Sequence, residues 1–468
     1  MGRLFGTDGV RGVAGHDLTA QLAMDLAIAA VPALASGTVG TATAATHPVA
    51  VIGRDSRASG DFLEAAVVAG LATTGVDVLR LGVIPTPGVA YLTGALGADF
   101  GVVLSASHNP AQDNGIKFFG RGGVKLPDDT EDEIEARLRA HEPATEPAAG
   151  FGRVTDAYSK HETYLEHLLG TLPVAADGRA PLAGLRLVVD CAHGAAYSIG
   201  PRALRRAGAE VIAIGAAPDG LNINAGCGST HLEVLQAAVV AHGADGGLAF
   251  DGDADRCLAV DADGAPLDGD QILAVLAAEL KAAGKLVGDA VVVTVMSNLG
   301  FHDAMREAGI TVIETPVGDK HVYAAMRAGG YVLGGEQSGH IIQMGHATTG
   351  DGVLTGLHLL AAVNRGGVSM SAAAKTMTRY PQVLINVRGD IERGMASPGL
   401  APAVKTVQDA LGDAGRVLLR PSGTEPAIRV MVEAREAIMA ETLASKLAAA
   451  VRLAMDGADA GAIGQALA

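Results

Sequence analysis

Three aspartates stand at alternate positions in the middle of the chain, Asp251, Asp253 and Asp255. In an extended segment alternate side chains point the same way, so the three carboxylates would lie together. Like charges this close repel unless a cation neutralises them. Oxygen ligands without His or Cys suit a hard ion such as Mg²⁺ or Ca²⁺. The spacing therefore predicts a metal site.

Some neighbouring residues support this metal site and others leave an alternative open. An EF-hand is excluded, because its sixth position would be Arg256 instead of Gly and its twelfth would be Ala262 instead of Glu. A plain acidic turn stays open, since Asp261–Gly264 is a similar run that we interpret as a hairpin. Arg256 favours the metal site, because it adds a cation where a phosphate could bridge to the ion.

A candidate nucleophile is Ser107, which lies in the loop Ser105–Pro110 and precedes Lys117 in sequence. No Gly-x-Ser-x-Gly motif surrounds it, which disfavours acyl transfer. A loop serine alone is usually only a turn residue. Together with a metal triad, however, it predicts phosphoryl transfer, the chemistry that needs both parts.

Near the C-terminus, one short segment is rich in groups that bind phosphate: Arg420, Ser422, Gly423, Thr424 and Arg429. Backbone amides around a glycine, two hydroxyls and two guanidinium groups supply the donors that phosphate oxygens require. The alternative is a turn with solvated arginines.

Glu336, Ser338 and His340 also alternate, and could present a carboxylate, a hydroxyl and an imidazole to a polyol. A structural hydrogen bond is the more usual role of such a histidine. Lys320 and Arg11 are further candidate cations, although lone basic residues usually lie on the surface.

Each of these loops follows a segment that we predict to be a strand. The four segments are Phe100–Leu104, Gly247–Phe250, Tyr331–Leu333 and Val417–Leu419. In open α/β sheets ligands bind beyond the carboxyl ends of strands. We therefore expect the four loops to converge on one cleft.

Short apolar runs alternate with amphipathic stretches along most of the chain, which is typical of parallel sheets with crossover helices. The expected strands are Val49–Ile52, Val76–Leu81, Leu185–Asp190, Val211–Ile214, Val291–Val295 and Thr311–Glu314, and the expected helices include Ser59–Thr74, capped by Ser59, and Phe301–Ala308. The C-terminal part differs, with strands at Val383–Val387, Val417–Arg420 and Ile428–Glu433 interleaved with two helices. This pattern indicates a smaller α+β domain.

A chain of 468 residues is expected to form roughly three or four domains. Their predicted bounds are 1–160, 161–263, 264–373 and 374–468. The Pro- and Glu-rich segment Glu142–Gly150 loosens the chain near the first boundary, and Ser36–His47 is predicted to be a surface loop.

Composition excludes several classes of partner. The formal net charge of −16 argues against nucleic-acid binding. No apolar run reaches the ~20 residues needed to span a membrane, and the first residues do not resemble a signal peptide, so a cytoplasmic protein is expected. Cys191, Cys227 and Cys257 form neither a zinc pattern nor a disulfide framework, and are interpreted as packing thiols.

With these residues, the chain resembles the α-D-phosphohexomutase family over essentially its full length. The resemblance runs from Phe5–Gly12 through Gly53–Arg57 and the four loops to Ile428–Met431. It implies three similar mixed-sheet α/β domains plus a smaller C-terminal α+β domain around a central cleft. The roles it implies are catalysis by Ser107, Lys117, His340 and Arg11, binding of one Mg²⁺ per chain by the three aspartates and Ser107, sugar recognition by Glu336, Ser338, His340, Lys320 and Arg256, and phosphate binding by the 420–429 segment.

The resemblance also implies a reaction. A phosphorylated Ser107 would give its phosphoryl group to a hexose phosphate, and the resulting bisphosphorylated sugar would return its other phosphoryl group after turning over. A hexose bisphosphate is then the expected activator, and the fourth domain is expected to hinge. The protein is expected to be a monomer or homodimer.

Within the family, Ser105 and Gln337 favour the branch that acts on glucosamine phosphates and feeds UDP-N-acetylglucosamine synthesis. The phosphomannomutase/phosphoglucomutase branch is the alternative. A sugar-phosphate phosphatase and a non-catalytic sensor are less favoured, because a sensor need not keep the serine, the triad, Lys117 and His340.

Overall fold

The structure is a computed structural model that describes residues 3–6, 8–35, 47–140, 150–173, 178–421 and 426–467. The predicted surface loop before His47, nearly all of Glu142–Gly150, and Ser422, Gly423 and Thr424 lie outside the described residues. The chain divides into two compact units, one of Met1–Met296 with Gly309–Thr376 and one of Ser297–Ala308 with Met377–Ala468. None of the described helices is both long and apolar enough to cross a membrane.

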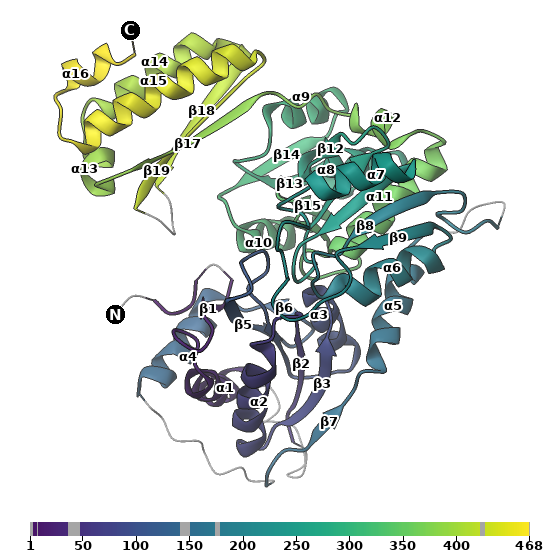
Figure 1. Ribbon diagram of the computed structural model, residues 1–468. Helices are drawn as coiled ribbons and strands as arrows, with labels where there is room; N and C mark the ends of the chain where they lie inside the picture. The colour runs from purple at the N-terminus through teal and green to yellow at the C-terminus, as the bar shows by residue number, and fades with distance from the viewer. Residues whose placement is uncertain are drawn as a thin grey trace. The chain divides into compact units, whose positions relative to one another are not determined.

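The first sheet of the larger unit is mixed, with strand order β1-β5-β4-β2-β3-β7 and β6 paired to β5. Strand β2 pairs in parallel with β3 and β4, whereas β5 runs antiparallel to β4. Helices α1 and α2 lie side by side next to this sheet (Figure 1). The elements are β1 (Val10–Val13), α1 (Ala20–Leu34), β2 (Val49–Arg54), α2 (Gly60–Thr73), β3 (Asp77–Val83), α3 (Thr86–Ala95), β4 (Phe100–Leu104), β5 (Asp113–Gly120), β6 (Val124–Lys125), α4 (Asp128–Ala140) and β7 (Val154–Asp156).

The second sheet has the order β12-β11-β10-β8-β9, and its middle strand β10 is parallel to β8 but antiparallel to β11. Strands β11 and β12 pair across Asp261–Gly264, which confirms the predicted hairpin. The elements are α5 (Lys160–Gly170), β8 (Arg186–Asp190), α6 (Ala196–Arg206), β9 (Glu210–Ile214), α7 (Glu233–His242), β10 (Gly246–Phe250), β11 (Cys257–Asp261) and β12 (Pro266–Leu267).

The third sheet has the order β14-β13-β15-β16, with β15 parallel to β13 and antiparallel to β16. Its elements are α8 (Gly269–Ala282), β13 (Ala290–Thr294), α9 (Leu299–Glu307), β14 (Thr311–Thr315), α10 (Asp319–Gly329), β15 (Leu333–Gly335), β16 (Ile341–Gln343), α11 (Gly352–Gly366) and α12 (Met370–Ala374). Strand β15 begins two residues later than the predicted Tyr331–Leu333, because Gly334 and Gly335 complete its ladder.

The three sheets share one arrangement that decides where the functional loops lie. In each, a parallel strand ends in a loop, and the chain returns as an antiparallel neighbour: β4 to β5, β10 to β11, and β15 to β16. These loops contain Ser107, the three aspartates and the Glu336–His340 segment. The predicted set of similar mixed-sheet α/β domains is confirmed.

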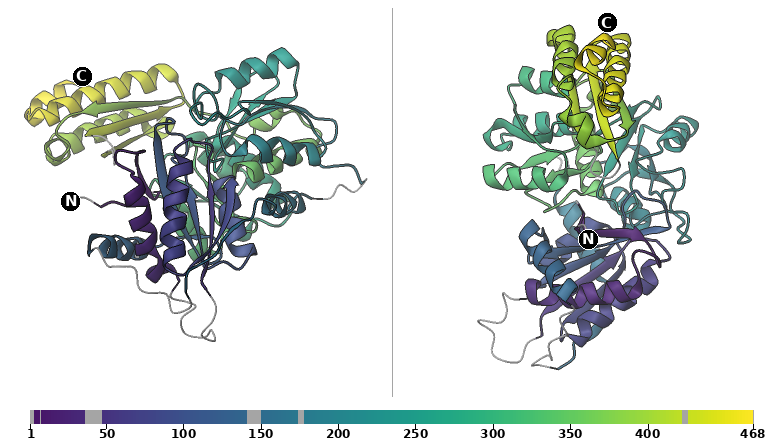
Figure 2. Two further views of the ribbon diagram at one scale, coloured as in Figure 1. Left: turned by 60° about the horizontal axis from the view of Figure 1, so that its bottom comes forward. Right: turned by 90° about the vertical axis from the view of Figure 1, so that its left-hand side faces the viewer.

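The smaller unit holds an antiparallel sheet of order β17-β19-β18, and α14 and α15 lie side by side on one face of it (Figure 2). Its elements are β17 (Gln382–Arg388), α13 (Ile391–Ala396), α14 (Leu400–Leu411), β18 (Gly415–Pro421), β19 (Ala427–Ala434), α15 (Ala437–Met455) and α16 (Ala460–Gln465). The prediction of two helices here was incomplete. Helices α13 and α16 span six residues each, too few for an apolar period to stand out.

Helix α9 belongs to the smaller unit, and a buried carboxylate explains why. Glu433 on β19 accepts hydrogen bonds from Asn298 Nδ2 at 2.6 Å and Leu299 N at 3.1 Å, at the start of α9. The same carboxylate pairs with Arg416 at 2.6 Å.

The predicted cap of α2 is wrong. Ser59 precedes the helix, but its side chain makes no capping hydrogen bond. Its Oγ instead accepts a hydrogen bond from Asn114 Nδ2 at 2.8 Å, from strand β5. A tertiary contact has therefore taken the hydroxyl that local sequence assigned to the helix.

The cysteine prediction is confirmed. Cys191, Cys227 and Cys257 are all buried and free. Burial raises the pKa of each thiol, which disfavours the reactive thiolate.

Candidate active site

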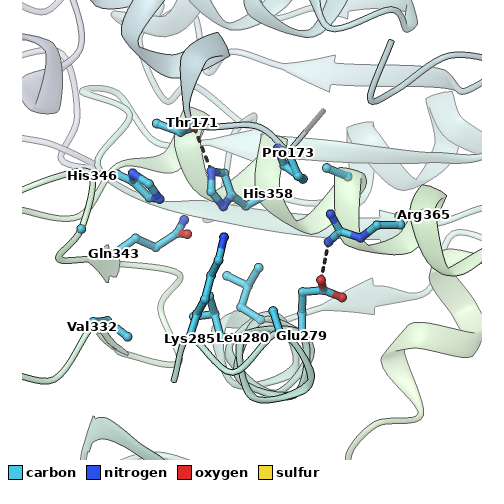
Figure 3. A pocket seen from close by; sticks show the side chains of 14 residues that line it. Thr171, Pro173, Glu279, Leu280, Lys285, Val332, Gln343, His346, His358 and Arg365 are labelled. Atoms are coloured by element: carbon cyan, nitrogen blue, oxygen red, sulfur yellow. Dashed lines mark hydrogen bonds and ion pairs between the residues drawn. The ribbon is translucent and has the colours of Figure 1, made fainter. Parts of the chain in front are cut away.

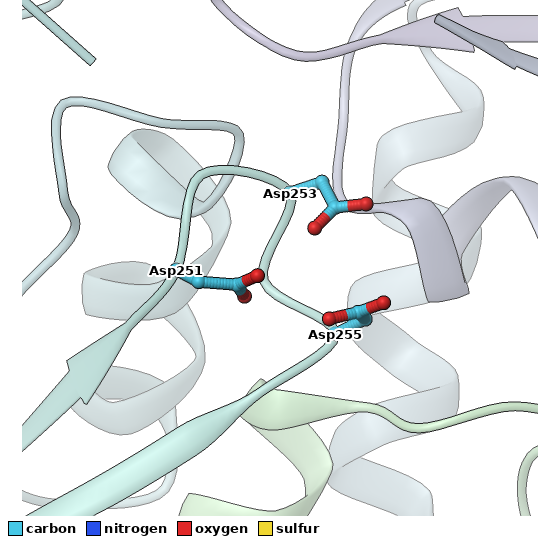
Figure 4. A group of neighbouring side chains, drawn as sticks. All are labelled: Asp251, Asp253 and Asp255. Atoms are coloured by element: carbon cyan, nitrogen blue, oxygen red, sulfur yellow. The ribbon is translucent and has the colours of Figure 1, made fainter. Parts of the chain in front are cut away.

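The three aspartates converge at the turn between β10 and β11 (Figure 4). All three are buried, and each offers a carboxylate oxygen within 4.8 Å of those of the other two. The convergence that the sequence predicted is confirmed, but the extended geometry is wrong. The segment is a turn in which Ala254 has φ 56°, and Arg256 N donates to Asp251 Oδ1 at 3.1 Å. Tight turning, and not strand alternation, brings the carboxylates together.

The chemistry of this cluster fits a magnesium ion. Within the part of the chain that the structure describes, it is the only group of three acidic, His or Cys side chains close enough to share an ion. Asp253 Oδ1 and Asp255 Oδ1 are buried and accept no hydrogen bond. Burial, followed by the charges of Asp255 and Asp253, raises the pKa of Asp251 well above its usual range. A cluster of buried carboxylates that offers oxygen ligands alone is an environment that suits a hard divalent cation.

Ser107 lies against this cluster. It follows β4 and its Oγ donates to Asp251 Oδ2 at 2.5 Å, so the first and second loops meet. His108 Nδ1 is 3.3 Å from the same Oγ. Ser107 has φ 51°, a left-handed conformation that non-glycine residues seldom adopt and that is frequent at functional sites.

A buried arginine fixes the serine loop. The Arg57 guanidinium, with no exposed side-chain surface, donates to the carbonyls of Ser107 at 2.9 Å and Asn109 at 2.8 Å. Asp55 neutralises it at 2.9 Å and also accepts from Ser105 Oγ at 2.6 Å. Sequence reasoning missed this clamp, although Gly53–Arg57 was noted for its resemblance.

Lys117 on β5 reaches the carboxylates of the aspartate cluster from the first sheet. Its Nζ lies 2.5 Å from Asp8 Oδ2 and 3.2 Å from Asp253 Oδ2. Burial alone would lower the pKa of Lys117, but Asp253 and Asp8 raise it above its usual value. Lys117 is therefore a fixed cation, suited to binding phosphate oxygens and not to accepting a proton.

His340 brings the third loop to the same place. Its Nδ1 is 3.5 Å from Asp255 Oδ2, and its Nε2 accepts from Gly350 N at 3.1 Å and lies 3.5 Å from Asp319 Oδ2. The Gly350 bond puts the proton of the neutral ring on Nδ1, facing Asp255. Burial lowers the pKa of His340, but Asp255 and Asp319 outweigh it and raise the pKa.

The other two members of the third loop behave differently from one another. Glu336 Oε1 accepts a hydrogen bond from Gly318 N at 3.1 Å. One oxygen of this carboxylate is therefore already occupied by a contact within the larger unit. Ser338 Oγ is buried and finds no hydrogen-bond partner among the described residues, which leaves a hydroxyl available to a polar ligand.

Arg11 and Arg256 lie near Ser107, whereas Lys320 pairs with a residue outside the aspartate cluster. Arg11 pairs with Asp8 at 2.5 Å and Arg256 with Asp255 at 3.9 Å, and in the part of the chain that the structure describes the Nε atom of each arginine is buried without a hydrogen-bond partner. Burial, then Arg256 and Arg11, lower the pKa of His108 to about 4. Lys320 Nζ pairs with Asp128 at 2.9 Å, on a partly exposed surface.

Sequence comparison agrees with this geometry. Models of the α/β/α domains I, II and III of the phosphoglucomutase/phosphomannomutase family match residues 2–145, 162–264 and 268–380, and the C-terminal domain model matches residues 384–450. The chain belongs to the phosphoglucomutase/phosphomannomutase family.

Two curated relatives and two solved structures illustrate the similarity. Phosphoglucosamine mutase of Thermobifida fusca is 62% identical over 97% of this chain and 98% of its own, and that of Streptomyces griseus is 59% identical over 97% and 100%. A family protein from Burkholderia thailandensis superposes with TM-score 0.80 at 25% identity over 98% of both chains. Aspergillus fumigatus N-acetylphosphoglucosamine mutase, solved with GlcNAc-6P and magnesium, has TM-score 0.66 at 20% identity over 97% and 96%.

In this family the metal is magnesium, and the buried aspartates are groups that can hold it. Three residues beside them were not selected from the sequence. Asp8 lies between Lys117 and Lys125, and Lys125 also pairs with Asp319. Asp8 and Asp319 stand in the same motifs as Arg11 and Lys320, and the substrate-binding role of Lys320 stays a prediction.

The fourth loop belongs to the smaller unit. Arg420 on β18 and Arg429 on β19 are paired directly across the sheet, and their Nε atoms are buried without hydrogen-bond partners among the residues that the structure describes. Burial and then Arg429 lower the pKa of Arg420. Two adjacent guanidinium groups fit a phosphate site, which stays a prediction.

Proposed function

We propose that the chain interconverts glucosamine 6-phosphate and glucosamine 1-phosphate through a phosphorylated Ser107 and a bisphosphorylated sugar. The observation that carries the phosphoryl transfer is the 2.5 Å contact between Ser107 Oγ and Asp251, inside the aspartate cluster. The choice of glucosamine rests on the relatives named phosphoglucosamine mutase, at 59–62% identity over nearly the full length.

In the first half-reaction the sugar hydroxyl oxygen loses its proton and forms a bond to the phosphorus on Ser107, while the bond from phosphorus to Ser107 Oγ breaks and Oγ takes up one proton. The second half-reaction reverses this at the other end of the sugar, so phosphoryl groups balance over one cycle. Asp251, Asp253, Asp255 and Ser107 would hold Mg²⁺, which supplies positive charge to the transferring phosphoryl group.

The protonation states around the serine support distinct roles for its neighbours. Lys117 keeps its charge because Asp253 and Asp8 lie beside it, so we assign it to phosphate oxygens. His108 is neutral at pH 7, since its pKa lies at about 4. The neutral His108 ring, whose Nδ1 lies 3.3 Å from Ser107 Oγ, can therefore accept a proton from that oxygen.

The unpartnered polar atoms support sugar-phosphate binding at the same place. Ser338 Oγ, Arg11 Nε and Arg256 Nε are buried and have no hydrogen-bond partner. An unsatisfied buried polar group is costly, and a polyol phosphate offers hydroxyls and anionic oxygens to satisfy such groups. We assign Glu336 and His340 to the sugar as well, and leave Lys320 as a more distant cation.

We further propose that a hexose bisphosphate loads Ser107, that the protein acts in the cytoplasm, and that its product feeds UDP-N-acetylglucosamine synthesis. Incubation with glucose 1,6-bisphosphate followed by intact-mass measurement tests the loading. A mass gain that a phosphatase removes is the expected result.

Substrate specificity is tested by kcat/KM on the 1-phosphates of glucosamine, glucose and mannose. We expect the glucosamine substrate to have the highest value. A higher value on glucose or mannose phosphate would place the chain in the phosphomannomutase/phosphoglucomutase branch. Release of inorganic phosphate without isomerisation would indicate a phosphatase.

The proposed phosphate grip gives a separate prediction. Replacing Arg420 with alanine should raise KM by about ten- to one-hundred-fold, because a hydrogen bond to a charged group contributes about 1.5–3 kcal/mol and each 1.4 kcal/mol is tenfold in affinity. The bisphosphorylated intermediate should also escape and accumulate in solution. Steady-state kinetics and a stopped assay for the intermediate measure both effects.

Arg393, exposed on α13 and paired with Asp390, supplies the matched control in the same unit. Arg393→Ala should leave KM unchanged. If Arg420→Ala also leaves KM and intermediate release unchanged, the 420–429 loop is a structural turn and its assignment fails.

A further inference from the structure

A cavity of about 320 Å³ lies in the larger unit and contains none of the residues of the candidate active site (Figure 3). Its walls come from the end of α5, from α8, from β16 and from α11. This volume falls within the range of small-molecule sites, ~300–1,000 Å³. Apolar side chains supply much of the lining, among them Pro173, Leu276, Leu280 and Val332.

A buried amide in this cavity has an unused donor. Gln343, on β16, is 5% exposed, and its Nε2 has no hydrogen-bond partner within the described part of the chain. In Figure 3 its amide points into the space beside His346, His358 and Lys285. An apolar side chain would fill this position without that cost, so the unsatisfied donor is the kind of feature that a ligand explains.

The imidazoles beside the amide are neutral. Burial, followed by His346, Arg365 and Lys285, lowers the pKa of His358 to about 4. Burial, followed by His167 and Lys285, lowers the pKa of His346. Neither ring therefore adds a positive charge to the cavity near pH 7.

The hydrogen bonds settle which nitrogen of His358 carries the proton. Thr171 Oγ1 donates its single proton to Leu168 O at 2.7 Å. The 2.9 Å contact with His358 Nε2 must therefore be donated by the ring. Its Nδ1 is left with a lone pair.

Fixed charge in the cavity is positive. Arg365 is neutralised by Glu279. Lys285 is an exposed residue of the lining, and among the residues that the structure describes it makes no ion pair. Among the described residues, the lining thus combines one ammonium without an ion pair, one amide donor without a partner, the lone pair of His358 Nδ1 and an apolar wall.

We propose that this cavity binds a small organic anion, with an apolar body against α8 and α11 and a terminal carboxylate or phosphate that accepts hydrogen bonds from Gln343 Nε2 and Lys285 Nζ. A cation would meet Lys285 and find no free carboxylate among the lining residues that the structure describes. A fully apolar ligand would leave the Gln343 amide unsatisfied. The site lies next to the active site in sequence, since β16 starts directly after His340.

Matched probes test the head group. Binding of 3-phenylpropanoate, 3-phenylpropan-1-ol and 3-phenylpropan-1-amine to the full-length, Mg²⁺-loaded protein is titrated by saturation-transfer difference NMR. The carboxylate should bind at least about ten-fold more tightly than the alcohol, in keeping with a hydrogen bond to a charged group, and the amine should bind weakest. A parallel titration with 2-phenylethyl phosphate identifies which anionic group is preferred.

Two variants locate the binding. Gln343→Leu keeps the side-chain size and removes the amide donor, and it should weaken the preferred anion by about ten-fold. Its melting temperature should be no lower than that of the wild type, because the lost donor has no partner. Lys285→Gln, at an exposed position, should weaken the anion without affecting folding. Lys405→Gln, an equal charge change at an exposed position on α14, should have no effect.

The proposal is overturned if the three phenylpropyl probes bind equally, if no anion binds, or if Gln343→Leu and Lys285→Gln both bind the anion as the wild type does. The last outcome would mean that the anion occupies the active-site cations instead. Should Gln343→Leu prove unstable, the comparison of Lys285→Gln with Lys405→Gln still decides the question.

Discussion

Replacing Ser107 with alanine should reduce sugar-phosphate isomerisation to background while the protein stays folded. The substitution removes a single oxygen, the one that donates to Asp251 Oδ2 at 2.5 Å and that carries the phosphoryl group in the proposed reaction. The loop itself should persist, since the Arg57 guanidinium binds the Ser107 carbonyl, which alanine retains. Isomerisation is measured by coupled assay, and folding by melting temperature.

Intact-mass measurement distinguishes a lost nucleophile from a merely distorted site. After incubation with glucose 1,6-bisphosphate, the wild type should gain the mass of one phosphoryl group and Ser107→Ala should not. Ser159, which precedes α5 and makes no capping hydrogen bond, provides the control: Ser159→Ala should be as active as the wild type. Turnover by Ser107→Ala at the wild-type rate would refute the phosphoserine mechanism.

Sequence alone predicted those parts of the fold that depend on local pattern. Apolar runs bounded by glycine located strands such as β2, β8 and β13 to within about two residues, since a buried parallel strand needs a continuous apolar run. The post-strand position of the loops followed from the same pattern. The convergence of the first three loops is confirmed by the contacts of Ser107 with Asp251 and of His340 with Asp255.

What sequence could not predict depends on partners that are distant in the chain. Arg57 acts on carbonyls some fifty residues away, and no local spacing marks an arginine as a clamp. The Ser59 hydroxyl is claimed by Asn114, although an N-cap was the locally favoured use. Asp319 pairs with Lys125 and lies 3.5 Å from His340, whereas Lys320 pairs with Asp128, because α10 starts at this point and neighbouring helical residues face different directions.

The second large effect is expected from removing one negative charge from the aspartate cluster. Asp253→Asn should lower kcat by about 100-fold or more and raise the Mg²⁺ concentration needed for half-maximal activity, while KM for the sugar phosphate changes less. The loss of one group that stabilises transition-state charge typically costs 10²–10³ in kcat. Asp253 holds two other partners in place, Thr86 Oγ1 at 2.6 Å and Lys117 Nζ at 3.2 Å. Asparagine can still accept the hydrogen bond from Thr86, but it carries no charge to neutralise Lys117.

Metal binding itself must be measured, because a fall in kcat alone could come from a displaced Lys117. Titration with Mn²⁺ followed by electron paramagnetic resonance reports the ion directly, and Asp253→Asn should weaken it. Asp263→Asn is the matched control, since Asp263 is an exposed aspartate in the neighbouring acidic hairpin turn and outside the cluster. Weakened Mn²⁺ binding in Asp253→Asn but not in Asp263→Asn assigns the ion to the three buried aspartates. Equal Mn²⁺ binding by both variants, with kcat unchanged in each, would make the Asp251–Asp255 segment a structural acidic turn, and the orphaned oxygens of Asp253 and Asp255 would then lack an explanation.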